Sequence, residues 1–285
     1  MTRCLRPKKF GYGDSAMSSR SRHHGSFEDR YVAFVDILGF RNIVARMERE
    51  QGLFSTVRDA LKTIDEQARE FRNYRVARKK SHEALIASGQ VPLTPPPQLQ
   101  MTAFSDCYVI SETAPAWRVL AGVQALGATL LAQGILCRGA VVRGAAYHRD
   151  RVLFGPAVIE AYELESQVAK YPRILVTEKV RKAAWDYHKD RWKGRLFIQD
   201  TDGCWFINVL TPSMSVWKAL PTTNEDVSSR EFLQTVRKRL TRQLSEAQGD
   251  LGRLSKLQWL GNHFNKLATE RGKVDLLVFP EDGRD

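Results

Sequence analysis

The pattern of apolar and polar positions along the chain predicts a buried strand followed by helices. The run YVAFVDILGF at 31–40 is apolar or glycine except for Asp36, and it is rich in β-branched and aromatic residues. Such a short run is typical of a strand covered on both faces of a sheet. The stretch 41–73 is polar with apolar residues at helical spacing, which predicts helix. The basic segment 74–98 ends in VPLTPPPQ and predicts an inserted loop or short helix that leads into extended chain.

The rest of the chain predicts three hairpins separated by helices. In LQMTAFSDCYVISE two strand-like runs meet at Ser105 and Asp106, which places Asp106 at the tip of a hairpin. The uncharged stretch 119–136 has nearly the length of a membrane span, but its leucines and valine repeat at helical spacing, so we expect a helix packed on a sheet and no membrane segment. The expected elements, in order, are a hairpin over 99–112, a helix over 115–134, a hairpin over 135–155, a helix over 156–168, a strand and helix over 173–180, a hairpin in RLFIQD and CWFINVL, and basic helices over 228–270.

This order of elements predicts an α+β fold in which helices pack on a largely antiparallel sheet. Strand, helix, hairpin, helix, strand is close to the split βαββαβ, or ferredoxin-like, arrangement. We expect a flexible basic arm at 1–27, one domain over 28–212 that contains the insertion 74–98, and a C-terminal helical extension over 213–285.

Composition adds a basic surface to this picture. The chain has 285 residues, a net charge of +12, a pI near 9.7, 43% hydrophobic residues and a mean hydropathy of −0.37, as in an ordinary soluble protein with a sizeable core. The charge suits an anionic partner such as a nucleotide. No motif points to nucleic acid, which we do not expect as a partner.

The cysteines and the first residues predict a cytoplasmic location. Cys4, Cys107, Cys137 and Cys204 are scattered without C-x-x-C spacing, which favours reduced thiols over a disulfide framework or a zinc site. The start MTRCLRPKKF lacks the apolar core of a secretory signal.

Asp36 is the first candidate for chemistry, because an ionised carboxylate in a buried strand is costly unless something compensates its charge. In a βαββαβ fold the end of the first strand can lie beside the turn that carries Asp106. Two adjacent carboxylates are unfavourable unless one is protonated or a cation lies between them. Divalent cations prefer such oxygen ligands, and a pair of them can clamp a phosphoryl transfer. A helix cap, an ion pair with Arg138 and a glycosidase-like acid–base pair are the alternatives.

Five segments in collinear order over 31–180 resemble a known family. FVDILGF, FSDCYVIS, CRGAVVRG, FGPAVIEAYELES and RILVTEKV are similar to the core motifs of class III nucleotidyl cyclases, and most of all to the pyrimidine (uridylate) cyclases of bacterial anti-phage Pycsar systems. The resemblance implies a cyclase-like fold and conversion of UTP to 3′,5′-cyclic UMP and pyrophosphate. It also implies a head-to-tail homodimer with sites at the subunit boundary, and a separate effector that responds to the cyclic nucleotide.

The resemblance assigns roles to individual residues. Asp36 and Asp106 match the metal-binding aspartates, the backbone carbonyl of Ile37 is a further ligand, and the cofactors implied are two divalent cations, manganese or magnesium. Arg138 matches a phosphate-binding arginine, so that Asp36, Asp106 and Arg138 form the catalytic set. Tyr162 and Arg143 are candidate nucleotide contacts. Arg143 is one of several basic residues that could replace the transition-state arginine of the family, which this chain lacks.

Departures from the family pattern bear on specificity. Thr102 and Val152 stand where purine cyclases carry a lysine and an aspartate that read the base, so we expect a pyrimidine pocket. Ile159 and Glu163 stand in place of the transition-state asparagine and arginine, and the late phosphate-binding lysine has no clear match. A cytidylate or other cyclase, a non-catalytic nucleotide sensor and a polymerase-palm nucleotidyl transferase remain alternatives, whereas the missing G-G-D/E-E-F turn disfavours a diguanylate cyclase.

Overall fold

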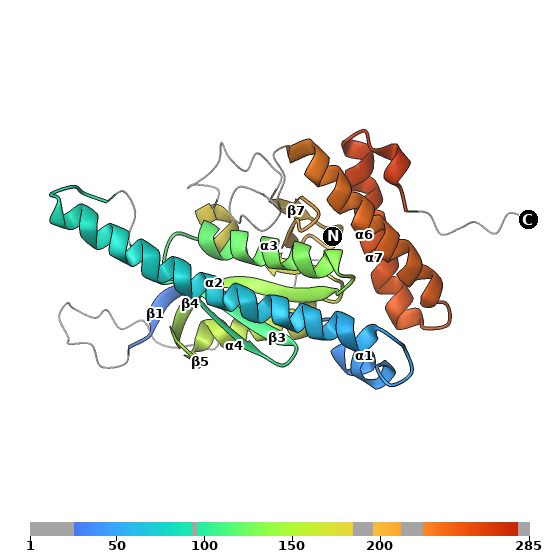
Figure 1. The fold of residues 1–285 in the computed structure, drawn as a ribbon, viewed down its shortest axis with the longest axis horizontal. Coiled ribbons are helices and arrows are strands. Elements are labelled where there is room, and N and C mark those ends of the chain that lie inside the picture. The colour runs from blue at the N-terminus through green and yellow to red at the C-terminus, as the bar shows by residue number, and fades with distance from the viewer. Residues whose placement is uncertain (1–25, 93–95, 185–195, 212–224, 279–285) are drawn as a thin grey trace, which may run out of the picture.

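The computed structural model describes residues 26–92, 96–184, 196–211 and 225–278, and these form one eight-stranded sheet with helices on both faces (Figure 1). The strand order is β2-β3-β1-β4-β6-β8-β7, and β5 pairs with β4 outside this path. The strands are β1 (Glu28–Ile37), β2 (Gln100–Phe104), β3 (Cys107–Glu112), β4 (Cys137–Arg149), β5 (Val152–Phe154), β6 (Ile174–Val176), β7 (Phe197–Gln199) and β8 (Trp205–Ile207).

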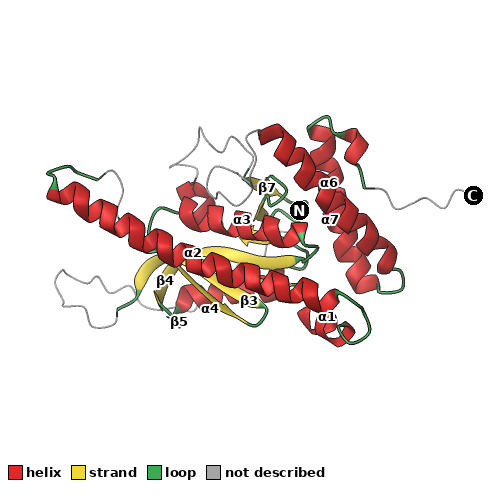
Figure 2. Ribbon diagram, in the orientation of Figure 1, coloured by secondary structure: helices red, strands yellow, loops and turns green. Residues whose placement is uncertain are grey.

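The helices lie between the strands in the predicted order and follow them at the C-terminal side (Figure 2). They are α1 (Phe40–Arg46), α2 (Leu53–Ala87), α3 (Trp117–Ala132), α4 (Pro156–Glu163), the π-helical turn η1 (Leu164–Val168), a further helix over 178–184, α6 (Glu225–Glu246), α7 (Leu251–Glu270) and the 3-10 turn η2 (Val274–Leu276). None of the helices in the described ranges has an apolar stretch long enough to cross a bilayer.

The central strand is β1, which pairs antiparallel with β3 on one side and with β4 on the other. The pairing of β4 with β6 is parallel, and the other pairings between described strands are antiparallel. The α+β class and the βαββαβ order are therefore confirmed. Within β1 the register places Asp36 opposite Cys107 of β3 and opposite Arg138 of β4.

The two faces of the sheet bury different helices. Val35 and Ile37 of β1 belong to the larger core, which α2 and α3 complete, whereas Val32 packs with Ala157 and Ala161 of α4 on the other face. Successive side chains of a strand point to opposite faces. The side chain of Asp36 is therefore directed to the face that carries α4.

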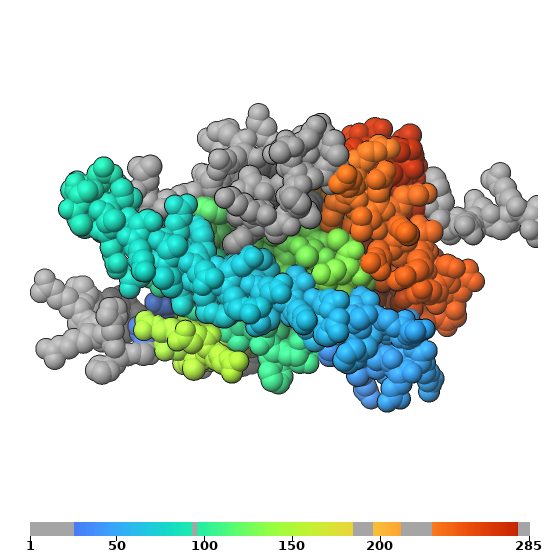
Figure 3. Space-filling model, viewed as in Figure 1, coloured from blue at the N-terminus to red at the C-terminus, as the bar shows by residue number. Residues whose placement is uncertain are grey.

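The C-terminal helices are attached through a core of their own. Leu233 and Leu240 of α6 and Leu257 and Phe264 of α7 are buried together with Leu131 of α3. Figure 3 shows α6 and α7 packed against the body beside α3. The helices predicted over 228–270 are thus confirmed, and the boundary at 212/213 lies outside the described residues.

Helix α2 is longer than predicted. We expected the helix to end near residue 73, but α2 continues without interruption to Ala87, so 74–87 is neither a loop nor a separate short helix. The stretch 53–87 contains neither glycine nor proline, and it is rich in alanine, arginine, lysine and glutamate, which favour helix. Its last buried residue is Phe71, and the following turns protrude from the body (Figure 3). The arm 1–27 lies almost entirely outside the described residues.

The cysteines differ from expectation at one position. Cys107 and Cys137 have free thiols, whereas Cys204 is disulfide-bonded. The expectation of reduced thiols is therefore wrong for Cys204, and Cys4 lies outside the described residues.

Candidate functional site

The two predicted aspartates meet at one end of the sheet. Asp36 is the second-last residue of β1, and Asp106 lies in the turn between β2 and β3. The backbone N–H of Ile37 donates to the carbonyl oxygen of Asp106 over 2.9 Å, which joins the end of β1 to that turn. Ser105 just before it has φ 54°, a left-handed conformation that few residues other than glycine adopt. The predicted juxtaposition of Asp36 and Asp106 is confirmed.

The carboxyl group of Asp36 has a raised pKa, because it is partly buried and lies near other carboxylates. Burial, together with the nearby carboxylates of Glu165 and Asp106, raises the pKa of Asp36 to about 7, and Arg138 offsets only part of this rise. The side chain is 22% exposed, so the site remains open to solvent and to ligands. A cation bound beside Asp36 would stabilise the ionised form of its carboxyl group.

The residues present fit a divalent cation. Asp36, Asp106 and the carbonyl of Ile37 would offer oxygen ligands, which magnesium and manganese prefer. Within the described ranges no three or more His, Cys, Asp or Glu side chains are grouped as a metal site. Two carboxylates with backbone and substrate oxygens are the set that the residues provide.

Arg138 approaches Asp36 from the neighbouring strand. Its Nε lies 4.0 Å from Oδ2 of Asp36 and only 2.5 Å from Oε1 of Glu165, whose side chain is 3% exposed. The ion pair with Asp36 that we considered as an alternative is thus the weaker of the two contacts. Sequence reasoning missed Glu165. A signal was present, because Ala157, Ala161 and Glu165 recur at four-residue spacing and continue the buried face of α4.

Tyr162 lies near the aspartates. Its ring, on α4, packs edge-on against Phe34 at 5.5 Å between centroids, and Phe34 precedes Asp36 by two residues on the same face of β1. The side chain is 53% exposed and free to contact a ligand. The structure therefore brings Tyr162 to the site, and its role as a nucleotide contact stays a prediction.

Arg143 lies apart from Asp36 within one chain. It is opposite Tyr31 in the register, five positions along β4 from Arg138, and on the other face of the sheet. Its guanidinium lies 5.0 Å from the ring of Tyr31 and donates to Asp29 over 3.0 Å. A contact from Arg143 to nucleotide stays a prediction, and it would require another subunit.

Class III cyclases carry base-reading and transition-state residues at four positions that are Thr102, Val152, Ile159 and Glu163 in this chain. The last three of these are exposed to solvent. Val152 on β5 is 56% exposed and Ile159 on α4 is 60% exposed. Glu163 is also exposed. Thr102 instead takes part in a hydrogen-bonded network with His148 and Asp150.

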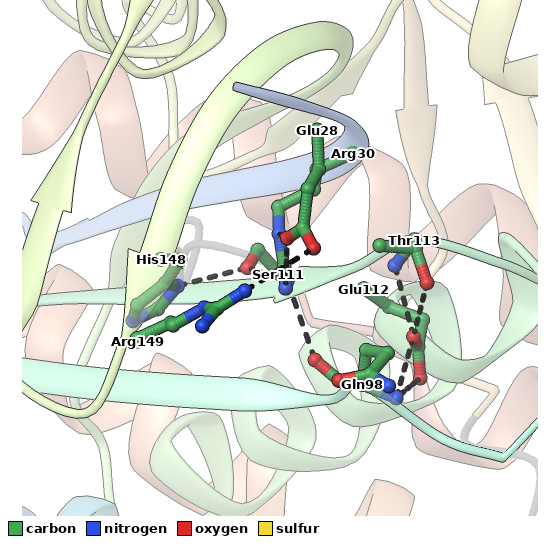
Figure 4. A network of polar contacts seen from close by, with 8 residues as sticks. All are labelled: Glu28, Arg30, Gln98, Ser111, Glu112, Thr113, His148 and Arg149. Carbon is green, nitrogen blue, oxygen red and sulfur yellow. Dashed lines mark hydrogen bonds and ion pairs between the residues drawn. The ribbon is translucent and has the colours of Figure 1, made fainter. Parts of the chain in front are cut away.

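A buried network joins β1, β3 and β4, and Figure 4 shows its members Arg30, Ser111 and His148. Nη1 of Arg30 donates to Oγ of Ser111 over 2.9 Å, and Oγ lies 2.8 Å from Nδ1 of His148. The other ring nitrogen of His148 lies 2.9 Å from Oγ1 of Thr102, which donates to the carbonyl of Asp150 over 2.8 Å. Since the one hydroxyl hydrogen of Thr102 is donated to the carbonyl of Asp150, Nε2 of His148 donates to Oγ1 of Thr102. Burial favours the neutral ring, in which Nδ1 accepts from the hydroxyl of Ser111.

This neutral histidine predicts loss of stability in acid. Burial, with the charges of Arg30 and Arg75, lowers the pKa of His148 to about 3. Below pH 6.5 the unfolded chain binds a proton that the folded chain does not, so stability is complete above pH 6.5 and is lost as the pH falls toward 3. We expect His148 to account for about 2 kcal/mol of the stability lost between pH 7.5 and 5.

Urea unfolding of the native chain and of His148→Gln at both pH values measures this. The variant should show the smaller loss of unfolding free energy, while His263, with a lowered pKa of about 4, contributes equally to both proteins. An equal loss in the two proteins would show that His148 is not buried in the neutral form.

Comparison with known proteins adds two structural similarities. No protein-family model matches the chain, and no curated protein matches it. The chain is similar to the catalytic core of a rhodopsin-guanylyl cyclase with converted specificity in complex with ATPαS, at 15% identity and a TM-score of 0.40, over 65% of this chain and 97% of that one. It is also similar to a bacterial light-regulated adenylyl cyclase, at 14% identity and a TM-score of 0.37, over 74% of this chain and 58% of that one.

Proposed function

We propose that the protein is a nucleotidyl cyclase that converts UTP to 3′,5′-cyclic UMP and pyrophosphate. The observation that carries the proposal is the meeting of Asp36 and Asp106 at the end of β1, where burial and neighbouring carboxylates raise the pKa of Asp36 to about 7. The five collinear motifs over 31–180 support the same assignment.

In this proposal the chain binds the triphosphate and orients its reacting atoms. Asp36, Asp106 and the carbonyl of Ile37 would hold two divalent cations, manganese or magnesium, which when bound supply the charge that acidifies the ribose 3′-hydroxyl and holds the phosphates. The 3′-oxygen forms a bond to the α-phosphorus as the bond to pyrophosphate breaks and the hydroxyl proton leaves to solvent. Arg138 presents a guanidinium beside Asp36, where it can stabilise negative charge that develops on the α-phosphate.

The expected base preference follows from Thr102 and Val152. The hydroxyl hydrogen of Thr102 is engaged by Asp150, and Val152 has no polar atom on its side chain, so neither offers the charged groups with which purine cyclases read adenine. A base that leaves buried polar groups unpaired is rejected strongly. We expect UTP to be preferred over ATP and GTP by about 100-fold or more in kcat/KM, and over CTP by a smaller factor.

The test is incubation of the purified chain with each of the four ribonucleoside triphosphates and manganese, with products identified by mass. Asp36→Asn serves as the blank. A preference for CTP or ATP would replace the uridylate assignment and leave the cyclase. Binding of nucleotide without any cyclic product would favour the non-catalytic sensor. That alternative stands because Ile159 and Glu163 occupy the positions of the transition-state asparagine and arginine of class III cyclases.

We further propose that the active form is a head-to-tail homodimer. Large apolar side chains are exposed on the strands and helix nearest the site: Phe104 (79%), Phe154 (51%), Ile159 (60%) and Tyr162 (53%). A second copy would cover them and could bring Arg143 to the nucleotide. Mixing equal amounts of inactive Asp36→Ala and Arg143→Ala chains should restore about one quarter of native activity, because half of the dimers are mixed and each has one intact site. A fully active protein that sediments as a monomer would exclude this arrangement.

The biological setting proposed here follows from the resemblance to the Pycsar cyclases. Cyclic UMP would be a second messenger made in the cytoplasm during anti-phage defence and read by a separate effector. Loss of phage protection in cells that carry the Asp36→Ala chain would support this role, and undiminished protection would contradict it.

A further inference from the structure

The carboxylate of Glu165 is the least expected charge in the molecule. It lies in the π-helical turn η1 directly after α4, and its side chain is 3% exposed. Burial and the nearby Asp106 raise the pKa of Glu165, while Arg138 opposes this rise. A third carboxylate beside Asp36 and Asp106 adds to the repulsion at the site, so its presence requires a compensating interaction.

Arg138 supplies that interaction, and in doing so it is shared unequally between two carboxylates. Its Nε lies 2.5 Å from Glu165 but 4.0 Å from Asp36, which is the outer limit of an ion pair. Neither Nε of Arg138 nor Oε1 of Glu165 makes a well-directed hydrogen bond within the described residues. The contact is a close pairing of charges, and it draws the guanidinium toward η1.

The unequal sharing matters because either Arg138 or a bound cation can compensate the negative charge of Asp36. An arginine in full contact with Asp36 would satisfy its charge and would compete with a cation for the same oxygens. With the charge of Glu165 removed, Asp36 is the carboxylate that remains within ion-pair distance of Arg138 among the described residues, at 4.0 Å.

We propose that Glu165 is a positioning residue that holds Arg138 away from Asp36 and thereby keeps Asp36 and Asp106 open to a divalent cation. The inference rests on the proposed function only for the identity of the ligand, a divalent cation. It assigns to Glu165 an indirect effect on cation binding, exerted through Arg138 alone.

The experiment measures binding of Mn²⁺ alone to the full chain by calorimetry, without nucleotide. Glu165→Gln should weaken Mn²⁺ binding about tenfold or more, because Arg138 then pairs with Asp36. The double variant Glu165→Gln with Arg138→Gln should bind Mn²⁺ within about threefold of the native chain, since no arginine remains to compete. Glu163→Gln is the matched control, two residues earlier and exposed, and should leave binding unchanged.

Two results would overturn the inference. One is native Mn²⁺ binding by Glu165→Gln, and the other is failure of the double variant to regain binding, which would make Glu165 a cation ligand or a purely structural residue. Arg138→Gln alone provides a second measurement if Glu165→Gln does not fold: it should bind Mn²⁺ at least as tightly as the native chain, and weaker binding would equally refute the competition. Since no turnover is measured, these outcomes are independent of whether the protein is a cyclase.

Discussion

Asp36→Asn and Asp106→Asn should each abolish turnover while leaving the chain folded. If the two carboxylates hold the cations jointly, an amide in place of either leaves too little negative charge to retain them, and we expect kcat/KM to fall by about 1000-fold or more. Chelation of the native enzyme should have the same effect, and added manganese or magnesium should reverse it. Near-native turnover by either variant would contradict the proposal that Asp36 and Asp106 jointly hold the cations.

Asp36→Asn should not destabilise the metal-free chain. The folded-state pKa of Asp36 is raised from 3.8 to about 7, so above pH 7 the ionised carboxylate costs stability that a neutral amide does not. In chelator at pH 8, the free energy of unfolding of Asp36→Asn, measured in urea, should exceed that of the native chain by about 1–3 kcal/mol. Asp59→Asn, on the exposed side of α2, is the control and should change neither activity nor stability appreciably. Marked destabilisation by Asp36→Asn would mean that the carboxylate has a structural partner.

Gly139→Ala should disrupt the same site through the backbone. A Cβ atom at Gly139 would lie 2.5 Å from the carbonyl oxygen of Phe34 and 2.9 Å from Cγ2 of Val35, so β1 and β4 could not keep their present separation. The clash lies next to Arg138 and close to Asp36. We expect a loss of about 3 kcal/mol or more in unfolding free energy, together with loss of turnover.

Gly261→Ala is the matched control for this substitution. Gly261 lies inside α7, where an added Cβ would meet nothing within 4 Å, so alanine should stabilise the helix by about 0.5–1 kcal/mol. Urea unfolding of both variants gives the comparison. If Gly139→Ala unfolds like the native chain, the strands are less tightly spaced than described.

The parts of the site that could be predicted from the sequence are those that follow from short-range pattern. Asp36 stood out because it interrupts an apolar run, and Asp106 because it sits where two strand-like runs meet. Their juxtaposition required only the order of elements in a βαββαβ fold. The hairpins and the helices over 117–132 and 225–270 were likewise recognisable from periodicity.

The parts that could not be predicted depend on packing between distant segments. Glu165 is buried because η1 folds back onto β4, and no local pattern states that Arg138 lies there. His148 reads as a turn residue, yet it is fully buried because β4 extends past β1 to reach Ser111 and Thr102. The length of α2 was underestimated because its last turns contact little of the body and follow helix propensity alone.

The central position of β1 has a consequence for how the site can move. Both edges of this strand are hydrogen-bonded along its length, and its two faces are buried in separate cores. Amide hydrogens in such a strand exchange with solvent mainly when the whole domain unfolds. The N–H groups in the middle of β1 should therefore be among the slowest of the described residues to exchange. Asp36 thus lies at the end of a strand that is held on both edges and both faces, and we expect any motion that accompanies ligand binding in η1, α4 and the turn that carries Asp106 rather than in β1.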